Sequence, residues 1–197
     1  MRAIDVAVNG QLRWRAGIAH ASLITPLLGA RVDDEPPASL MVSGMCDLGE
    51  GRVAHVYWCE SLALAEGDTV TFTFRESTNV TPPEKIVPTD SPEYIEEQRA
   101  FAETVRDFVP DRTPAVRTHA GLSFEYQLNG GSAKLASLIG GEEHILCSLD
   151  WVKQRPDQCG VCIRTFGDKA KPEHSPATEW LRASLALYDE LSVRIAA

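Results

Sequence analysis

One pair of cysteines, Cys159 and Cys162, has the C-x-x-C spacing of redox and metal sites. At a helix N-terminus such a pair can be redox-active, and in a zinc knuckle it can hold half of a site. A complete zinc site needs more ligands, for which His174 and Cys147 are the candidates. However, the alternation from Cys159 to Phe166 favours a strand, in which residues three apart point to opposite faces. We therefore expect structural cysteines, no metal site and no cofactor, with metal or redox chemistry as the alternatives.

Two histidines, His55 and His144, are candidates for acid–base chemistry. His144 directly follows Glu143 in a glycine-rich loop, and a histidine beside a carboxylate suits a general base. His55 precedes the strand residue Trp58, and a place on the wet face of a sheet is its ordinary alternative. No motif sets a nucleophile beside either histidine. A catalytic role for His55, His144 or Cys159 is therefore a hypothesis without a defined reaction.

The net charge of −9 argues against nucleic-acid binding, because phosphate neutralisation needs clustered Lys and Arg. The acidity is uneven: residues 1–115 carry 10 basic and 18 acidic side chains, and residues 116–197 carry 9 and 10. We expect a protein partner on the acidic first half, attracted by electrostatic steering. The alternative is that the acidic side chains serve solubility alone.

The compartment is predicted from the N-terminus and the cysteines. Asp5 interrupts what would have to be the apolar core of a signal peptide. No apolar run reaches the length of about 18 residues that a membrane span needs. An odd number of cysteines argues against a complete disulfide framework. We predict a cytoplasmic protein with no membrane segment.

The elements that would position these residues begin with a hairpin. Asn9-Gly10 separates two alternating runs, and this dipeptide suits the positive φ angles of a type I′ turn. Gly17 to Pro37 reads as irregular. Gly67 to Glu76 alternates strictly and predicts a half-buried strand. Ser91-Pro92, as N-cap and first turn, predicts an amphipathic helix that ends at Pro110.

The second half shows a similar order of elements. Asn129-Gly130 predicts a second hairpin, and His144 to Val152 and Cys159 to Phe166 predict strands. Ser175-Pro176 predicts a final helix. Its expected apolar face comprises Leu181, Ser184, Tyr188, Leu191 and Ile195.

These parallels predict an internal duplication. We match Asn9-Gly10 with Asn129-Gly130, Trp58 with Trp151, Asp68 with Asp157, and Ser91-Pro92 with Ser175-Pro176. The alternative is that any α+β chain rich in hairpins looks repetitive.

The first half also carries a set of short motifs with a family likeness. The motifs are Val6 to Gly10, Ala16-Gly17, Val42-Ser43-Gly44, Tyr57-Trp58 and Leu64 to Thr71. This set resembles small, mostly uncharacterised bacterial proteins with the pattern V-x-x-N-G, A-G, Trp strand and L-x-x-G-D-x-V-T. The resemblance covers about residues 4–76, and the second half departs from it at Asp157-Gln158-Cys159. The family has no catalytic residues, so the resemblance implies no functional site.

Together these patterns predict an α+β fold of two tandem ββββα units, residues 1–112 and 116–197. Each unit would form a small antiparallel sheet backed by one helix, and the two would pair about a pseudo-twofold axis. For function we expect a non-enzymatic protein-binding module, either immunity-like or an adaptor. The alternatives are an enzyme or small-ligand protein with a pocket between the units, and a subunit of a homo-oligomer.

Overall fold

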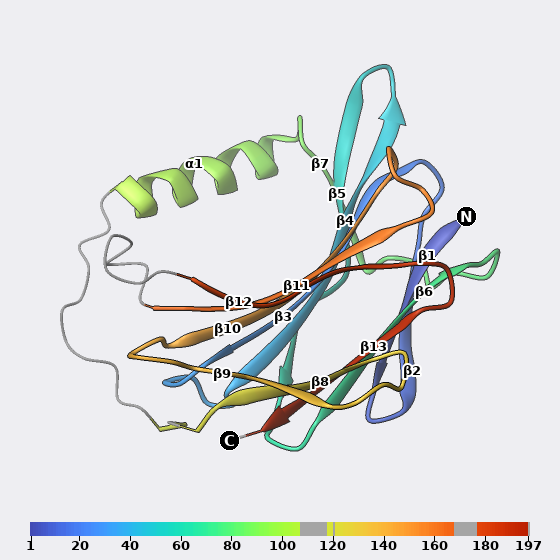
Figure 1. Cartoon of the computed structure of the whole chain (residues 1–197). Coiled ribbons are helices and arrows are strands. Elements are labelled where there is room, and N and C mark those ends of the chain that lie inside the picture. The colour runs from blue at the N-terminus through green and yellow to red at the C-terminus, as the bar shows by residue number, and fades with distance from the viewer. Residues whose placement is uncertain (107–117, 120, 168–176, 197) are drawn as a thin grey trace.

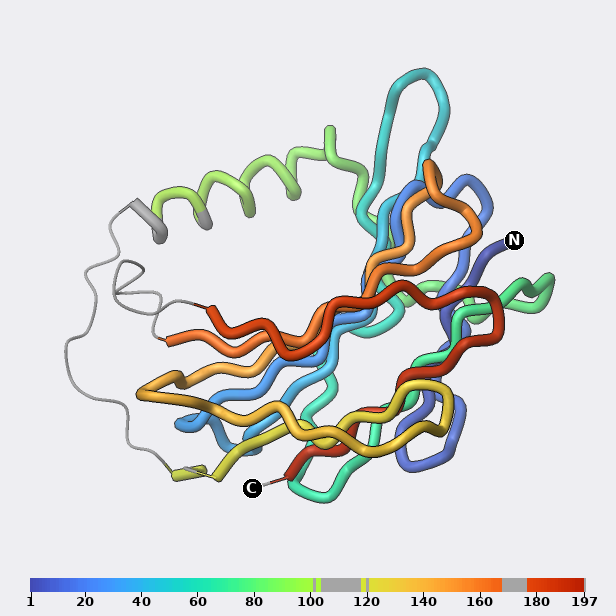
Figure 2. Tube along the Cα trace, viewed as in Figure 1, coloured from blue at the N-terminus to red at the C-terminus, as the bar shows by residue number. Residues whose placement is uncertain are grey.

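Two antiparallel sheets packed face to face form the body of the protein in the computed structural model, and one helix stands beside them (Figures 1 and 2). The structure describes residues 1–106, 118–119, 121–167 and 177–196. No helix within these ranges is long and apolar enough to span a membrane.

Sheet A has six strands and sheet B has seven, and every neighbouring pair of strands is antiparallel. The spatial order in sheet A is β2 (Gln11–Ala16), β1 (Arg2–Val8), β6 (Thr69–Glu76), β13 (Glu190–Ala196), β8 (Ser123–Leu128) and β9 (Lys134–Ser137). The order in sheet B is β12 (Thr178–Leu185), β11 (Cys159–Phe166), β10 (His144–Val152), β3 (Ala21–Arg31), β4 (Ala38–Gly49), β5 (Arg52–Leu64) and β7 (Lys85–Pro88). The helix α1 (Pro92–Arg106) follows β7.

The predicted α+β fold of two ββββα units is wrong. The described chain has one helix, and both sheets take strands from both halves of the sequence. The physical reason is that the apolar face of each sheet is covered by the other sheet, as in a β-sandwich, and not by a helix. The largest fully buried side chains lie in this shared core and include Trp58, Phe72, Phe74 and Phe124.

A six-strand repeat takes the place of the predicted unit. Strands β1 to β6 and β8 to β13 occupy the same positions in reverse order: β2-β1-β6 beside β13-β8-β9 in sheet A, and β5-β4-β3 beside β10-β11-β12 in sheet B. The registers also agree. Ile4 pairs with Ala16 where Phe124 pairs with Ala136. A pseudo-twofold axis therefore relates the two repeats, and it runs between β6 and β13 in sheet A and between β3 and β10 in sheet B.

Two of the residue matches predicted from the sequence are wrong in this repeat. Asp68 corresponds to Asp189 and not to Asp157, because each follows the last sheet-B strand of its repeat, β5 or β12, and precedes the strand that returns to sheet A, β6 or β13. Trp58 corresponds to Trp180 and not to Trp151. Both lie where the strand pairing shifts register, at Val42/Ser43 on β4 and at Ile163/Arg164 on β11.

The predicted C-terminal helix is also wrong, because its residues form β12 and β13. Its apolar residues recur at helical spacing, but Leu191, Val193 and Ile195 also alternate and are all fully buried between the sheets. Tyr188 has φ 72°, and this left-handed conformation turns the chain between the two strands. Ser175-Pro176, the predicted start of that helix, lies outside the described residues.

The irregular segment predicted from Gly17 to Pro37 contains the central strand β3. Pro26 made this strand hard to predict, because proline cannot donate to a ladder. Ile24 and Leu27 have pairing partners on β10, whereas Thr25 and Pro26 have none. The pairing is therefore interrupted at the residue that lacks an N–H. The Thr25 hydroxyl donates to Asp150 Oδ1 (3.2 Å) across this interruption.

Three local predictions are confirmed. Asn9-Gly10 and Asn129-Gly130 turn their hairpins with positive φ at all four residues. Gly67 to Glu76 contains the strand β6. Ser91 caps α1, since its Oγ accepts the N–H of Tyr94 (3.2 Å). The predicted helix end at Pro110 and the predicted boundary between residues 112 and 116 lie outside the described residues.

Candidate functional site

Each repeat joins its first hairpin to its last strand through an Asn–Asp pair. Asn9 Nδ2 donates to Asp68 Oδ1 (2.8 Å), and Asn9 Oδ1 accepts the N–H of Thr69 (2.9 Å). The other carboxylate oxygen of Asp68 accepts the N–H of Ala65 (2.8 Å). These bonds fix the turn between β5 and β6, where Gly67 has φ 89°. The Gly-Asp motif of the sequence therefore has a structural role here.

The second repeat makes the same contacts. Asn129 Nδ2 donates to Asp189 Oδ1 (2.9 Å), and Asn129 Oδ1 accepts the N–H of Glu190 (2.7 Å). Asp189 Oδ2 accepts the N–H of Ala186 (2.8 Å). Tyr188 stands where the first repeat has Gly67, in the same left-handed conformation. We call these two arrangements the Asn–Asp clasps.

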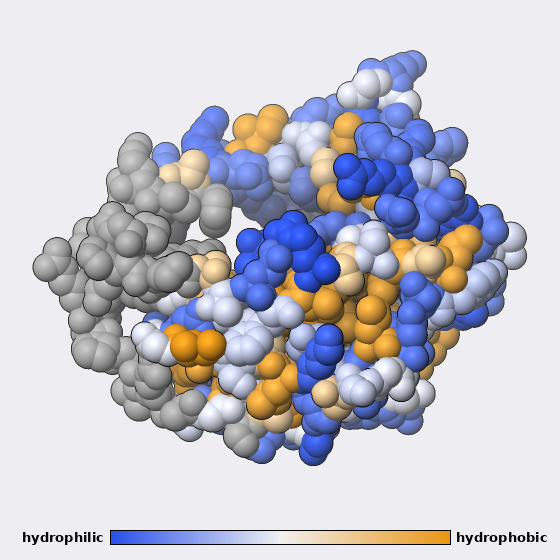
Figure 3. Space-filling model, in the orientation of Figure 1, coloured by the Kyte–Doolittle hydropathy of each residue, from blue (hydrophilic) through white to orange (hydrophobic). Residues whose placement is uncertain are grey.

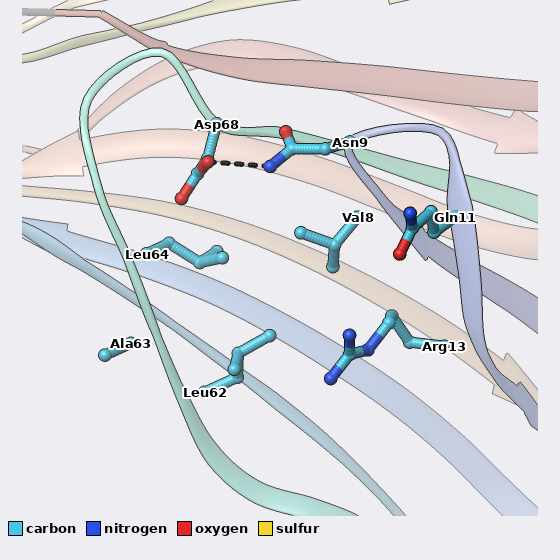
Figure 4. Close-up of a pocket in the computed structure, with 8 residues that line it drawn as sticks. All are labelled: Val8, Asn9, Gln11, Arg13, Leu62, Ala63, Leu64 and Asp68. Carbon is cyan, nitrogen blue, oxygen red and sulfur yellow. Dashed lines mark hydrogen bonds between the residues drawn. The ribbon is translucent and has the colours of Figure 1, made fainter.

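A hollow of about 310 Å³ lies beside the first clasp, between the β1–β2 hairpin and β5 (Figure 4). Figure 4 shows the Arg13 guanidinium pointing toward Leu62 and the Asn9 amide turned toward Asp68. Both polar groups of the clasp are thus bonded to each other or to backbone. The hollow offers one cation beside the apolar residues Leu62, Ala63 and Leu64, and no acid–base pair. Its lining residues are Val8, Asn9, Gln11, Arg13, Leu62, Ala63, Leu64 and Asp68.

His55 lies on the outer face of β5 and contacts the helix. Its Nε2 is 3.2 Å from the Tyr94 hydroxyl, and the two rings stack with centroids 5.2 Å apart. The Tyr57 ring also stacks with His55, with ring centroids 6.4 Å apart. His55 therefore anchors the first turns of α1 to sheet B, a contact that spacing along the sequence does not predict.

His144 lies at the opposite end of sheet B. Its ring stacks on Phe166 with centroids 5.0 Å apart. Across the sheet, His55 pairs with Met45, Met45 with Leu23, and Leu23 with Val152. Val152 is the last residue of β10, and His144 is its first. At about 3.3 Å per residue, the two ends of this strand are about 26 Å apart. The two histidines cannot act on one substrate atom.

Cys159 is fully buried and faces the core, opposite Trp151. Burial raises the pKa of its thiol to about 12, so the reactive thiolate is strongly disfavoured. Burial also raises the pKa of Cys147, which is likewise fully buried. Cys162 points to the other face of β11 and is partly exposed, as strand alternation predicts. The structure does not bring His55, His144 and Cys159 together.

The outer face of sheet A carries a charge cluster that the sequence pattern does not predict. Asp5 is buried, and its two oxygens accept from Arg15 Nε (2.6 Å) and Nη2 (3.0 Å) and from Arg75 Nη1 (2.6 Å). The pKa of Arg15 is raised mainly by its hydrogen bond to Asp5. The alternation of the strands places these side chains on the wet face. The three side chains come together because β1 pairs with both β2 and β6. No local sequence pattern predicts that pairing.

The helix α1 is the most exposed element of the described chain, and in Figure 1 it stands away from the sheets with its first turns beside β5 and β7. Every described side chain of α1 except Tyr94 is exposed. The helix carries Glu93, Glu96, Glu97 and Glu103. Asp90 and Glu60 extend this acidic surface onto the neighbouring loop and β5, where they pair with Arg52 (2.8 Å) and Lys85 (3.3 Å).

The candidate residues thus separate into the structural clasps, the two buried thiols of Cys147 and Cys159, and an exposed acidic helix. No group of three or more His, Cys, Asp or Glu in the described residues is arranged to hold a metal ion. Compared with known proteins, the chain matches no family model, no curated protein and no solved structure.

Proposed function

We propose that this protein is a non-enzymatic binding module, immunity-like or an adaptor, which engages a basic protein surface through α1. The observation that carries the proposal is the exposure of the helix. A lone helix of this length is marginal in water and gains most of its stability from packing an apolar face. Among the described side chains, Tyr94 alone is partly covered, and Ile95 is 48% exposed. A partner that covers the helix would supply the missing packing.

The negative charge of α1 favours a partner with a basic surface. Four glutamates against two arginines, Arg99 and Arg106, give α1 a net negative charge. Acidic surfaces accelerate encounter with basic partners and repel acidic ones. The Ser91 cap and the contact between Tyr94 and His55 hold the first turns in place, so that the glutamates are presented on an ordered helix.

The cysteines support a reducing compartment for this interaction. All five are free, at positions 46, 59, 147, 159 and 162. Disulfides are rare where thioredoxin and glutathione keep thiols reduced. A cytoplasmic location accordingly remains part of the proposal.

A charge-reversal experiment tests the proposal. Wild-type protein and the variant Glu93→Lys/Glu96→Lys are used as baits in lysate at low salt, with Glu66→Lys/Glu190→Lys as the control for total charge. Glu66 and Glu190 are exposed and lie away from α1. We expect a stoichiometric basic partner with the wild type and the control, and its loss with the helix variant. Equal recovery by both variants, or no recovery by the wild type, would refute the proposal.

A further inference from the structure

The two long sides of the sandwich differ in how the space between their outer strands is covered. On the first-repeat side the segment Ser77–Pro88, which we call the closing segment, crosses from sheet A to sheet B. The N–H of Thr81 donates to the Arg15 carbonyl (3.0 Å), and the N–H of Arg15 donates to Thr81 Oγ1 (2.9 Å). Further along, β7 pairs with β5 from Ala54 to Tyr57. The segment thereby bonds to both edge strands of this side.

Trp58 shows what the closing segment covers. Its side chain is fully buried, and its Nε1–H donates to the Thr81 carbonyl (2.9 Å). The ring also rests against Gly44, where an added Cβ would lie 3.3 Å from Trp58 Cζ3. A backbone carbonyl of an extended segment is thus the partner of this buried indole.

The second-repeat side, between the edge strands β9 and β12, we call the open side. Within the described part of the chain no strand pairs with the outer edge of β9 or β12. Trp180 takes the place of Trp58 but is partly exposed. Its Nε1–H donates to Thr165 Oγ1 (3.0 Å). Thr165 stands where the first repeat has Gly44, since they pair with Thr178 and Val56, each two residues before its tryptophan.

The open side leaves apolar surface uncovered. It faces the viewer in Figure 1, and Figure 3 shows apolar side chains gathered across the middle of this face. Ile139, on the connection that leaves β9, is 52% exposed. The partly buried apolar side chains here are Leu128, Leu138, Trp180, Leu181 and Leu187. Contiguous apolar surface of this kind marks interaction sites.

We infer that the open side is a docking site for an extended, proline-containing segment of a partner polypeptide. The segment adds a strand to β12 as β7 adds to β5, and then covers Trp180 as Ser77–Pro88 covers Trp58. This is strand addition to a sheet edge, in which backbone hydrogen bonds supply affinity and alternate side chains supply specificity. The inference goes beyond the acidic helix, which lies beside the opposite edge of sheet B.

The sequence of the closing segment indicates what kind of segment the open side would bind. Two prolines follow Thr81 and keep the crossing extended, and Ile86-Val87 provides β-branched residues for the added strand. A second copy of this chain is a poorer occupant. Two β12 strands that met edge to edge would bond to sheet B alone, whereas the closing segment also bonds to Arg15 in sheet A.

The test uses the peptide Thr78–Thr89 of this chain, TNVTPPEKIVPT, as the probe, with a scrambled peptide of the same composition beside it. Titration into the wild-type protein is followed by tryptophan emission, since the peptide has no tryptophan. We expect saturable binding that changes the emission of the wild type and of Trp14→Phe but not of Trp180→Phe. Amide exchange of β12 should slow at least threefold when the peptide is bound.

Surface variants locate the site without disturbing the core. Ile139→Asp should weaken binding at least fivefold, whereas Leu48→Asp, a matched change on the exposed β4–β5 hairpin, should leave it unchanged. Glu93→Lys/Glu96→Lys should also leave it unchanged. Equal binding of the scrambled peptide, an emission change that persists in Trp180→Phe, or no binding would overturn the inference. Slowing of β12 exchange by raised protein concentration alone would assign the edge to a second copy and overturn it too.

Discussion

Gly44 is the position at which a single methyl group should test the packing of the sandwich most severely. It lies on β4, and an ideal Cβ would be 2.5 Å from the carbonyl oxygen of Leu23 and 3.3 Å from Trp58 Cζ3. The first of these atoms belongs to the backbone of the central strand β3 and cannot turn away. Gly44→Ala must therefore displace a strand, or the indole with it.

The expected cost follows from two opposing effects. Overpacking of a well-packed core costs about 1–3 kcal/mol, and a backbone clash belongs at the upper end, about 3 kcal/mol. Replacing glycine by alanine returns about 0.4–1 kcal/mol through the unfolded chain. The free energy of unfolding should fall by about 2 kcal/mol. With a urea slope of about 2 kcal/mol/M, the midpoint moves down by about 1 M.

Two glycines provide matched controls for this variant. A Cβ at Gly29 would lie 3.8 Å from Leu146 Cδ1, and one at Gly160 would lie 3.6 Å from the Asp150 carbonyl, which are ordinary contacts. Gly29→Ala and Gly160→Ala should be neutral or stabilise by up to about 1 kcal/mol. Urea unfolding of all three variants is followed by tryptophan emission. A Gly44→Ala midpoint equal to those of the controls would refute the close packing of β4, β3 and Trp58.

Three further predictions concern the clasps, the charge cluster and the buried thiols. Asn9→Ala and Asn129→Ala should each lower the free energy of unfolding in urea by about 1–2 kcal/mol, because each removes two hydrogen bonds at a left-handed residue; unequal losses would contradict the equivalence of the clasps. Asp5→Asn should cost about 2–3 kcal/mol in the same assay, since two arginines lose their shared carboxylate, and the loss should shrink when the arginines are also replaced. Because burial raises the pKa of Cys159 to about 12, the unfolded chain releases this proton first as the pH rises above about 8.5. Stability should then fall by about 1.4 kcal/mol per pH unit for this thiol, and a Cys159→Ala variant should lose that part of the slope.

Local signals in the sequence were sufficient wherever one short segment decides the structure. The Asn-Gly hairpins and the Ser91 cap depend on backbone angles and on hydrogen bonds within a few residues, so they could be predicted. The end of the chain shows the limit of this approach. Leu191 and Ile195 fit both a helical stripe and an alternating strand, and pairing with β6 and β8 decides between them. Such pairing joins residues that are far apart in the sequence.

The repeat was misaligned for a related reason. Trp151 and Asp157 match the first half by residue type and order, whereas Asp189 matches it by hydrogen bonds and Trp180 by strand register. The missed contact between Tyr94 and His55 likewise joins two elements whose adjacency only the tertiary fold creates. Conversely, strand alternation placed Cys159 and Cys162 on opposite faces, because that inference needs a single strand.

The divergence between the repeats gives a last test of the open side. In the first repeat the indole N–H of Trp58 bonds to a carbonyl of the closing segment, above a glycine. In the second repeat Thr165 provides the acceptor from within, so Trp180 needs no covering strand to satisfy its N–H. Thr165→Val removes this acceptor while keeping the side-chain shape. The free protein should lose about 1 kcal/mol of stability. A docked peptide can then offer its own carbonyl to Trp180, as Thr81 does to Trp58. The Thr78–Thr89 peptide should therefore bind Thr165→Val several-fold more tightly than the wild type. Weaker or unchanged binding would show that the open side does not accept a segment in the manner of the first repeat.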